Sequence, residues 1–382
     1  MPCWDKNTGN TDILPINDKI PKNLREDDCR RVRKLKRKDT ACGKLSALTW
    51  KEVMLSRNEI FGFAALWIVL FHVRDNIGMG WFRGSYLLEA LLSVGNCGVD
   101  IFLFLSAVGL CRSVQTHSAK AFYKNRLLRL CVPYLITAVP YFVWYDFCLA
   151  KDGLWQFLLD VSTVSFWLEP ARYPVWYVSF VLILYALYPL IHHVDEKSRH
   201  RATAALILAA VLTEIWLLKN GSVVYTNAER ALSRIPVFLL GVILAPRVLE
   251  GKQIPMYQVI LAFAAGICSF LMVVRLRLPL IVDRYLYGIL AICFVIVFSF
   301  VKKQIPAKSF LRWFAWLGSI SFEIYVVHVF LIRVIRYLGL WTITGRKLFW
   351  YLLIPAAAIA AAKLIAMVSA TINRRLFRKR EG

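Results

Sequence analysis

The sequence predicts an all-α fold: a polytopic integral membrane bundle of about ten transmembrane helices. Hydrophobic residues make up 58% of the 382 residues and charged residues only 19%, whereas soluble proteins average about 45–50% and about 25%. The apolar residues gather in continuous runs, without the polar alternation that marks the strands of a membrane β-barrel. Since only helices or closed barrels span a bilayer, these runs indicate membrane helices.

Ten apolar runs are the candidate spans. They lie near 58–74, 96–113, 131–149, 175–193, 202–218, 234–249, 257–275, 285–301, 311–336 and 348–370. Several are shorter than the roughly 20 residues that a bilayer core requires. Residues 85–96 and 154–170 are candidates for interfacial or re-entrant pieces. We therefore assign residues 57–372 to a transmembrane domain.

Two basic, hydrophilic segments flank this domain, residues 1–56 and residues 373–382. An even number of spans places both ends of the chain on one side. The loops of the two sides carry equal numbers of basic residues, but the basic tails favour the cytoplasm for both termini. The basic segment RVIRYLGLWTITGRK fits this topology least well, because it falls on the outer side. The run CRRVRKLKRKD is interpreted as a juxtamembrane tail rather than a nucleic-acid or anionic-lipid patch. We expect a multi-pass protein of the plasma membrane, surrounded by lipid and without nucleic acid.

Five polar residues within the predicted spans are candidate catalytic residues. An ionisable group at membrane depth costs about 2.5–3.5 kcal/mol or more, so such groups commonly serve a function. From the helical rise of about 1.5 Å per residue, His72, Asp100 and His328 fall in the outer third of the membrane, and Ser106 and Glu323 nearer the midplane. Helix packing is the alternative role for each. Imidazole is the natural proton-transfer group near neutral pH, which singles out His72.

Two further segments carry candidate binding residues. In AFYKNRLLRLCVPY, Lys124, Arg126 and Arg129 lie at the inner end of the third span. Arg126 and Arg129 are three residues apart and share a helix face, where two guanidiniums suit phosphate oxygens; anchoring of the topology is the alternative. At the outer start of the fourth span, Trp176 and Tyr177 could wall a substrate mouth or form an interfacial aromatic belt.

The sequence lacks three common catalytic or nucleotide-binding motifs. No GxxxxGK[ST], HExxH or GxSxG element occurs, which argues against a nucleotide-driven pump, a zinc protease and a common serine hydrolase. The nine cysteines form no CxxC pair, so no metal site is predicted.

Five segments stand out by their order and spacing along the chain: RNEIFGFAALWIVLFH, which ends in His72; GVDIFLFLSAVGL, with Asp100, Phe102 and Ser106; FYKNRLLRLCVPY; FLLGVILA; and SISFEIYVVHVFLI, with His328. Together they resemble the membrane-bound acyltransferase 3 family over residues 57–372. The chain departs from the family at two positions: Phe61 stands where members commonly carry arginine, with Arg57 four residues before it as the candidate substitute, and Ala107 stands where glycine usually follows the serine.

The resemblance implies an O-acyltransferase that moves an acyl group, often acetyl, from cytoplasmic acyl-CoA to a hydroxyl of an extracytoplasmic glycan or related acceptor. Acyl-CoA is then a donor substrate, and no permanently bound cofactor is expected. Arg126, Arg129 and Lys124 would hold the donor phosphates, and His72 would act as general base or in an acyl relay. Asp100 or Glu323 would orient an imidazole. A proton-coupled transporter that uses the same residues and an inactive sensor or scaffold of this fold are the alternatives.

Overall fold

The computed structural model describes residues 47–78, 85–169, 174–221, 223–276, 278–305, 309–341 and 347–378. The basic run CRRVRKLKRKD lies outside the described residues. The strands of the described chain are short: β1 (Leu48–Thr49) pairs antiparallel with β2 (Gln253–Ile254).

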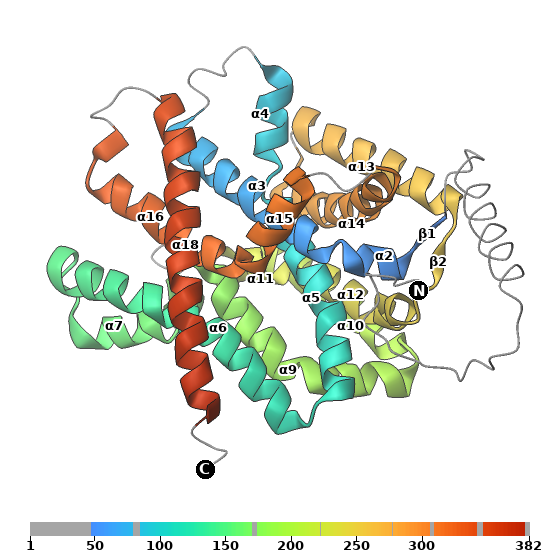
Figure 1. Cartoon of the computed structure of the whole chain (residues 1–382), viewed down its shortest axis with the longest axis horizontal. Coiled ribbons are helices and arrows are strands. Elements are labelled where there is room, and N and C mark those ends of the chain that lie inside the picture. Colours follow the sequence, from blue (N-terminus) through green and yellow to red (C-terminus); the bar gives the residue numbers. More distant parts are fainter. Residues whose placement is uncertain are drawn as a thin grey trace, which may run out of the picture. The chain divides into compact units, whose positions relative to one another are not determined.

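The described chain is 87% helical, and nine of its helices are long and apolar enough to cross a membrane. The number is ten if the bent pair α15–α16 counts as one span, which confirms the predicted polytopic helical bundle. In chain order the helices (Figure 1) are α2 (Trp50–Leu55), α3 (Arg57–Ile77), α4 (Tyr86–Ser93), α5 (Cys97–Thr116), α6 (Ala119–Phe142) with its π-helical continuation η2 (Val143–Leu149), α7 (Gly153–Val161), α8 (Ser165–Leu168), α9 (Trp176–Ser198), α10 (Arg201–Lys219), α11 (Val223–Leu232), α12 (Ile235–Leu249), α13 (Met256–Arg275), α14 (Leu280–Gln304), α15 (Ser309–Ser319), α16 (Ser321–Tyr337) and α18 (Lys347–Arg378).

The predicted ninth span, 311–336, is broken in two. α15 ends at Ser319, α16 begins at Ser321, and the two helices differ in direction by 72°. α15 instead packs across α3 at a crossing where Gly62 and Gly318 leave room for the backbones: a Cβ on either would strike a carbonyl oxygen of the other helix. Small residues allow such close approach. Because both halves are apolar, the hydropathy of the sequence does not reveal the bend.

Helix α6 begins well before the predicted third span, 131–149. It starts at Ala119, where the Ser118 hydroxyl accepts a hydrogen bond from the Ala121 amide and caps the helix. The basic element AFYKNRLLRL is therefore helical and forms the first turns of the same helix. This places its arginines on a rigid element rather than in a loop.

Residues 48–55 fall in the predicted hydrophilic extension, yet they fold against the bundle. Trp50 and Val53 are buried, and Thr49 forms a capping box with Glu52 at the start of α2. Lys303 of α14 pairs with Glu52, with 2.7 Å between Nζ and Oε1. At the other end of the chain, α18 continues past the predicted boundary at residue 372 to Arg378.

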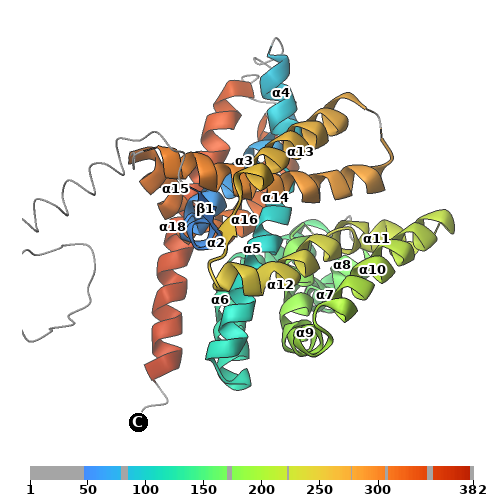
Figure 2. The same cartoon turned by 90° about the vertical axis from the view of Figure 1, so that its right-hand side faces the viewer.

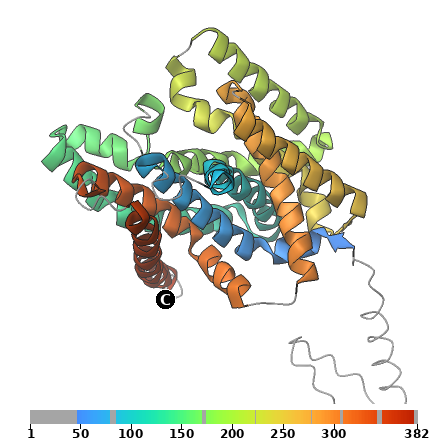
Figure 3. The same cartoon turned by 90° about the horizontal axis from the view of Figure 1, so that it is seen from above.

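Helices α3, α5 and α16 form the part of the bundle that carries the predicted site. α3 packs against α5, α15, α16 and α18, and Figure 3 shows α3 (blue) near the centre of the bundle. In α5, 78% of the membrane window is buried inside the protein, whereas in α10 the share is 11%. α13 and α14 run side by side away from this centre (Figure 2). The polar residues of α5 therefore face protein, while α10 turns its apolar side chains outward.

Candidate active site

His72 and His328 lie side by side, although they are far apart in the sequence. Their ring centroids are 5.1 Å apart and their planes meet at 68°. His72 stands near the end of α3 and is partly buried, and His328 stands in α16 and is fully buried. The direct packing of α3 on α16 thus joins the two predicted histidines into one unit, the histidine pair.

The backbone determines which nitrogen of each ring is available. His72 Nδ1 lies 2.9 Å from the Ile68 carbonyl oxygen, and His328 Nδ1 lies 3.0 Å from the Ile324 carbonyl oxygen. A carbonyl oxygen can only accept, so in the neutral ring Nδ1 carries the hydrogen and Nε2 keeps its lone pair. His328 Nε2 is buried without a hydrogen-bond partner in the described chain. Such a nitrogen can take a proton or attack a carbonyl carbon.

A polar pocket of about 510 Å³ opens beside His72, and we call it the histidine pocket. Its lining comes from α3, α9, α11, α14 and α16, and from the turns before α5, α9 and α12. Charged groups at membrane depth are costly and tend to serve function, so this concentration of guanidiniums indicates a binding site. Five arginines of the described chain line the pocket, together with His72, Asp75, Asn76, Asn96 and Trp176: Arg230, Arg234, Arg284, Arg333 and Arg336.

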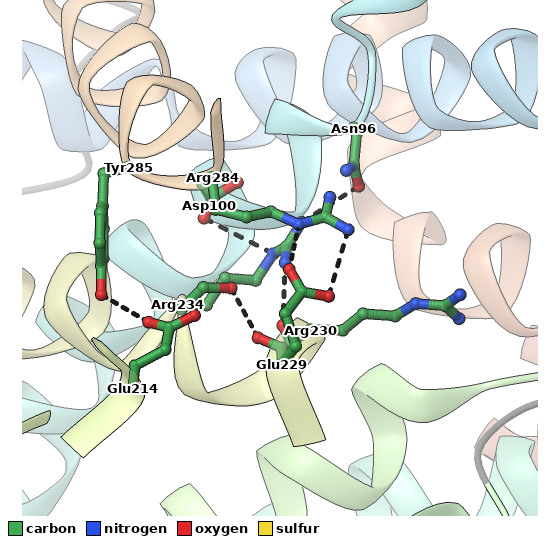
Figure 4. Close-up of polar contacts among 9 residues, drawn as sticks. Asn96, Asp100, Glu214, Glu229, Arg230, Arg234, Arg284 and Tyr285 are labelled. Carbon is green, nitrogen blue, oxygen red and sulfur yellow. Dashed lines mark hydrogen bonds and ion pairs between the residues drawn. The ribbon is translucent and has the colours of Figure 1, made fainter. Parts of the chain in front are cut away.

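Arg234 is the buried centre of this pocket (Figure 4). Its side chain is 1% exposed and forms an ion pair with Asp100, with 3.6 Å between Nε and Oδ1. Its Nη2 donates to Asn96 Oδ1 at 3.1 Å, and the guanidinium lies 4.9 Å over the ring of Trp176. Because a buried charge needs a partner, Arg234 ties the start of α12 to α5 and α9.

Two further buried pairs lie behind the arginines (Figure 4). Arg284 Nε donates to Glu229 Oε1 at 2.6 Å, and the Tyr285 hydroxyl donates to Glu214 Oε2 at 2.5 Å. Both carboxylates are buried. These contacts join α14 to α11 and α10, so the arginine layer is part of the packing between helices.

A smaller pocket of about 80 Å³ lies toward the opposite ends of the same helices, and we call it the serine pocket. Along α16, Ser321 lines this pocket and Arg336 lines the histidine pocket. Arg57 reaches the serine pocket across the ring of Phe61, 4.5 Å from its centroid. Arg57, the predicted substitute for the arginine that position 61 lacks, therefore lines the same pocket as Arg126 and Arg129. The lining comprises Arg57, Arg126, Arg129, Ser106, Phe61, Phe102, Leu130, Tyr177, Tyr185, Ser321, Phe322 and Tyr325.

Tyr177 and Tyr325 connect the serine pocket to the histidine pair. Both side chains line the serine pocket, and their ring centroids are 5.1 Å apart. The ring of Tyr325 in turn lies 5.6 Å from the ring of His328. A continuous row of rings therefore leads from the serine pocket through His328 to His72 and the histidine pocket.

The predicted aromatic residues are both buried, at 9% exposure for Trp176 and 6% for Tyr177. Residues of an interfacial belt would face outward, so the structure favours the alternative of a pocket wall. These two neighbours serve different pockets: Trp176 lines the histidine pocket and Tyr177 the serine pocket.

Three predicted residues stand away from their expected partners. Asp100 pairs with Arg234, and in the described chain neither histidine ring bonds to a carboxylate. Glu323, in the first turn of α16, and Lys124, in α6, are both partly buried. Neither residue lines the histidine pocket or the serine pocket. The geometry therefore gives no support to a carboxylate that orients an imidazole.

Sequence reasoning missed the five arginines of the histidine pocket. They stand at or near the predicted ends of spans, where basic residues are common. A signal was present nevertheless, because the outer loops carry as many basic residues as the inner loops. The segment RVIRYLGLWTITGRK begins with two of these arginines, Arg333 and Arg336.

The fold and the site define a polytopic membrane protein with a pair of histidines inside the helix bundle, where His72 lines one polar pocket and His328 contacts Tyr325, which lines the other. A family model described as an acyltransferase domain matches residues 62–370. The match covers most of the chain, and the protein belongs to the acyltransferase 3 family, whose members are membrane acyltransferases. No curated protein and no solved structure matches the chain.

Proposed function

We propose that the protein transfers an acyl group, acetyl in the first instance, from cytoplasmic acyl-CoA to a hydroxyl of an extracytoplasmic glycan or related acceptor. It would act in the plasma membrane with both termini in the cytoplasm. The observation that carries the proposal is the position of the histidine pair between two arginine-lined pockets. Each pocket offers a place for one substrate, and the pair stands where the acyl carbon must pass.

The serine pocket is the proposed donor side. It lies at the N-terminal ends of α3 and α16, which the predicted topology places toward the cytoplasm. Its volume of about 80 Å³ suits the thioester end of the donor rather than the nucleotide. Arg126 and the exposed Arg129 would bind phosphate oxygens at the mouth, while the Ser106 hydroxyl would donate to the thioester carbonyl.

The proposed chemistry is a direct transfer with His72 as general base. Its Nε2 takes the proton of the acceptor hydroxyl while the oxygen attacks the thioester carbonyl carbon. The tetrahedral intermediate then collapses, the C–S bond breaks, and the CoA thiolate takes the proton back from the imidazolium. The products are the O-acyl ester and free CoA thiol. His328, on the donor side of the pair, is the second candidate for the base.

The test replaces each histidine by glutamine, His72→Gln and His328→Gln. A glutamine amide can still donate to a helix carbonyl but cannot take a proton near neutral pH. General base catalysis contributes about 10²–10⁴-fold, so His72→Gln should lower acyl transfer by that order. The assay follows CoA release and label transfer from acetyl-CoA in membranes, with mass spectrometry of surface glycans for added acyl mass. His193→Gln is the matched control, because His193 is exposed and lines neither pocket.

The proposal fails if both glutamine variants retain near-normal transfer while present in the membrane at wild-type levels. The histidine pair would then serve packing alone. Uptake of a labelled solute against its gradient, without consumption of acyl-CoA, would favour the transporter alternative.

A further inference from the structure

The histidine pocket carries more positive charge than its own carboxylates neutralise. Five arginines line it against a single lining carboxylate, Asp75, and Asp75 already pairs with Arg74, with 3.0 Å between Nη1 and Oδ1. Behind the lining, Asp100 and Glu229 compensate for two of the five arginines. The excess positive charge therefore faces the open space of the pocket.

Arg230 and Arg336 are the arginines that contribute most to this excess. In the described chain neither guanidinium has a carboxylate within ion-pair distance, whereas Arg234 and Arg284 each have one. Figure 4 shows the Arg230 side chain extended away from the Arg284–Glu229 pair. Both side chains belong to exposed residues that line the pocket. A ligand can therefore bind both guanidiniums without breaking an ion pair in the part of the chain that the structure describes.

Anchoring of the topology does not explain this arrangement. An arginine that only marks the membrane surface extends into water or headgroups, whereas Arg234 is 1% exposed and its Nε has no hydrogen-bond partner among the described residues. The arginines come from three separate parts of the chain, the α11–α12 junction, α14 and α16, and converge on one pocket with His72. Convergence of guanidiniums beside an imidazole is the arrangement expected for recognition of an anion.

We infer that the acyl acceptor carries an oxyanion, phosphate or carboxylate, close to the hydroxyl that it offers, and that Arg230 and Arg336 bind this group. The inference rests on the proposed function, since it names the chemistry of the acceptor. A pocket of about 510 Å³ lies within the range of about 300–1,000 Å³ typical of small-molecule sites. An anion held by these arginines brings its molecule into the pocket that His72 lines. A phosphorylated or uronic-acid sugar and an anionic lipid headgroup share this chemistry.

The first experiment reads binding without activity. The purified full-length protein is treated with the arginine reagent phenylglyoxal, with and without inorganic phosphate, and modified arginines are located by mass spectrometry. Phosphate should reduce the labelling of Arg230 and Arg336 about tenfold at saturation. Arg275 is the control: it lies over the ring of Tyr86 and outside the histidine pocket, so its labelling should not change. Equal labelling of Arg230 and Arg336 with and without phosphate overturns the inference.

The second experiment compares acceptors that differ only in charge. Wild type and the Arg230→Gln/Arg336→Gln variant are supplied with acetyl-CoA and with glucose, glucose 6-phosphate or glucuronate. A charge-assisted hydrogen bond contributes enough that its loss weakens binding about tenfold or more. The variant should therefore raise the KM for the anionic sugars at least tenfold and leave the KM for glucose unchanged. Arg275→Gln should behave as wild type.

Lipid vesicles distinguish an acceptor whose oxyanion belongs to a lipid headgroup from a soluble acceptor. Phosphatidylglycerol in phosphatidylcholine vesicles replaces the sugar, and acylated lipid is measured by mass spectrometry. Transfer to the lipid but to neither anionic sugar assigns the oxyanion to a headgroup, and the reverse assigns it to a soluble or glycan-borne group. Equal use of glucose and its anionic partners by wild type and variant overturns the inference while acyl transfer stands. Absence of transfer to every acceptor contradicts the proposed function, and the phosphate protection then decides the anion site by itself.

Discussion

The two pockets differ most in how their arginines are held. In the histidine pocket, Arg234 and Arg284 each pair with a buried carboxylate, which makes them part of the packing between helices. In the serine pocket, Arg126 donates to the Gly109 carbonyl oxygen at 3.3 Å, and no ion pair with a carboxylate holds it or Arg129 in the described chain. Arg234 and Arg284 are thus built into the packing between helices, whereas no carboxylate of the described chain holds Arg126 or Arg129 at the serine pocket.

This difference suits the two substrates of the proposed reaction. A donor that must enter and leave with every turnover is served by charges at a mouth, because exposed ion contacts are weak and easily broken. An acceptor that must present one hydroxyl to one nitrogen is served by a preorganised wall, because catalysis depends on positioning. The comparison therefore predicts that mutations in the histidine pocket affect folding and acceptor use, and that mutations in the serine pocket affect donor use.

The largest expected effect concerns sidedness. If the serine pocket is the donor side, Gly382 and the N-terminal extension both lie in the cytoplasm. Reporter enzymes that are active only outside the cytoplasm should give no activity when fused before Met1 or after Gly382. Activity of an external reporter at either point would mean that the serine pocket faces the outside. The donor and acceptor would then have to be assigned to the opposite pockets.

The next effect is on stability, through the buried pair of the histidine pocket. Asp100→Asn leaves the guanidinium of Arg234 buried without a compensating charge, which costs about 3–5 kcal/mol. Asp75→Asn, whose pair with Arg74 is partly exposed, should cost about 0–1 kcal/mol. Unfolding of the purified protein in detergent measures both. The double variant Asp100→Asn/Arg234→Gln should recover part of the loss, and equal stabilities of the two single variants would contradict the contrast.

The smallest effect belongs to the serine pocket. Arg126→Ala with Arg129→Ala should raise the KM for acyl-CoA about tenfold, because charge-assisted contacts to phosphate are lost, with no change in the KM for the acceptor and little change in stability. Arg→Lys at both positions should restore donor binding only in part, because lysine lacks the bidentate fork. Steady-state kinetics over both substrates provide the measurement. An unchanged donor KM in the alanine variant would assign these arginines to topology anchoring.

Much of the architecture was predictable because membrane helices are encoded locally. The spans follow from apolar runs, and the rise per residue placed His72, Asp100 and His328 in one layer before any contact was known. The histidine pair and the Asp100–Arg234 contact agree with that layering. The predicted contact of Asp100 with a histidine is not formed, because Asp100 pairs with Arg234 instead. Depth specifies the layer of a side chain but not the neighbour that it faces within that layer.

The histidine pocket lay beyond sequence reasoning for a related reason. Arg230, Arg284 and Arg336 come from separate parts of the chain, and each taken alone resembles an ordinary basic residue at the end of a span. Only the packing of α11 against α9, of α14 against α5 and of α16 against α3 gathers them. The bend at Ile320 was equally hidden, since both halves are apolar, and the close contact of Gly318 with α3 joins segments remote in the chain.

The sequence by itself determined the class of the protein, the approximate positions of its spans and the polar residue types that lie within them. These properties depend on the transfer of each segment into lipid, which is a local quantity. The tertiary structure alone decided that the two histidines touch, that Arg57 reaches the serine pocket across Phe61, and that five arginines share one cavity. These are contacts between segments remote in the chain, and their geometry is set by how the helices pack rather than by the hydropathy of any one of them.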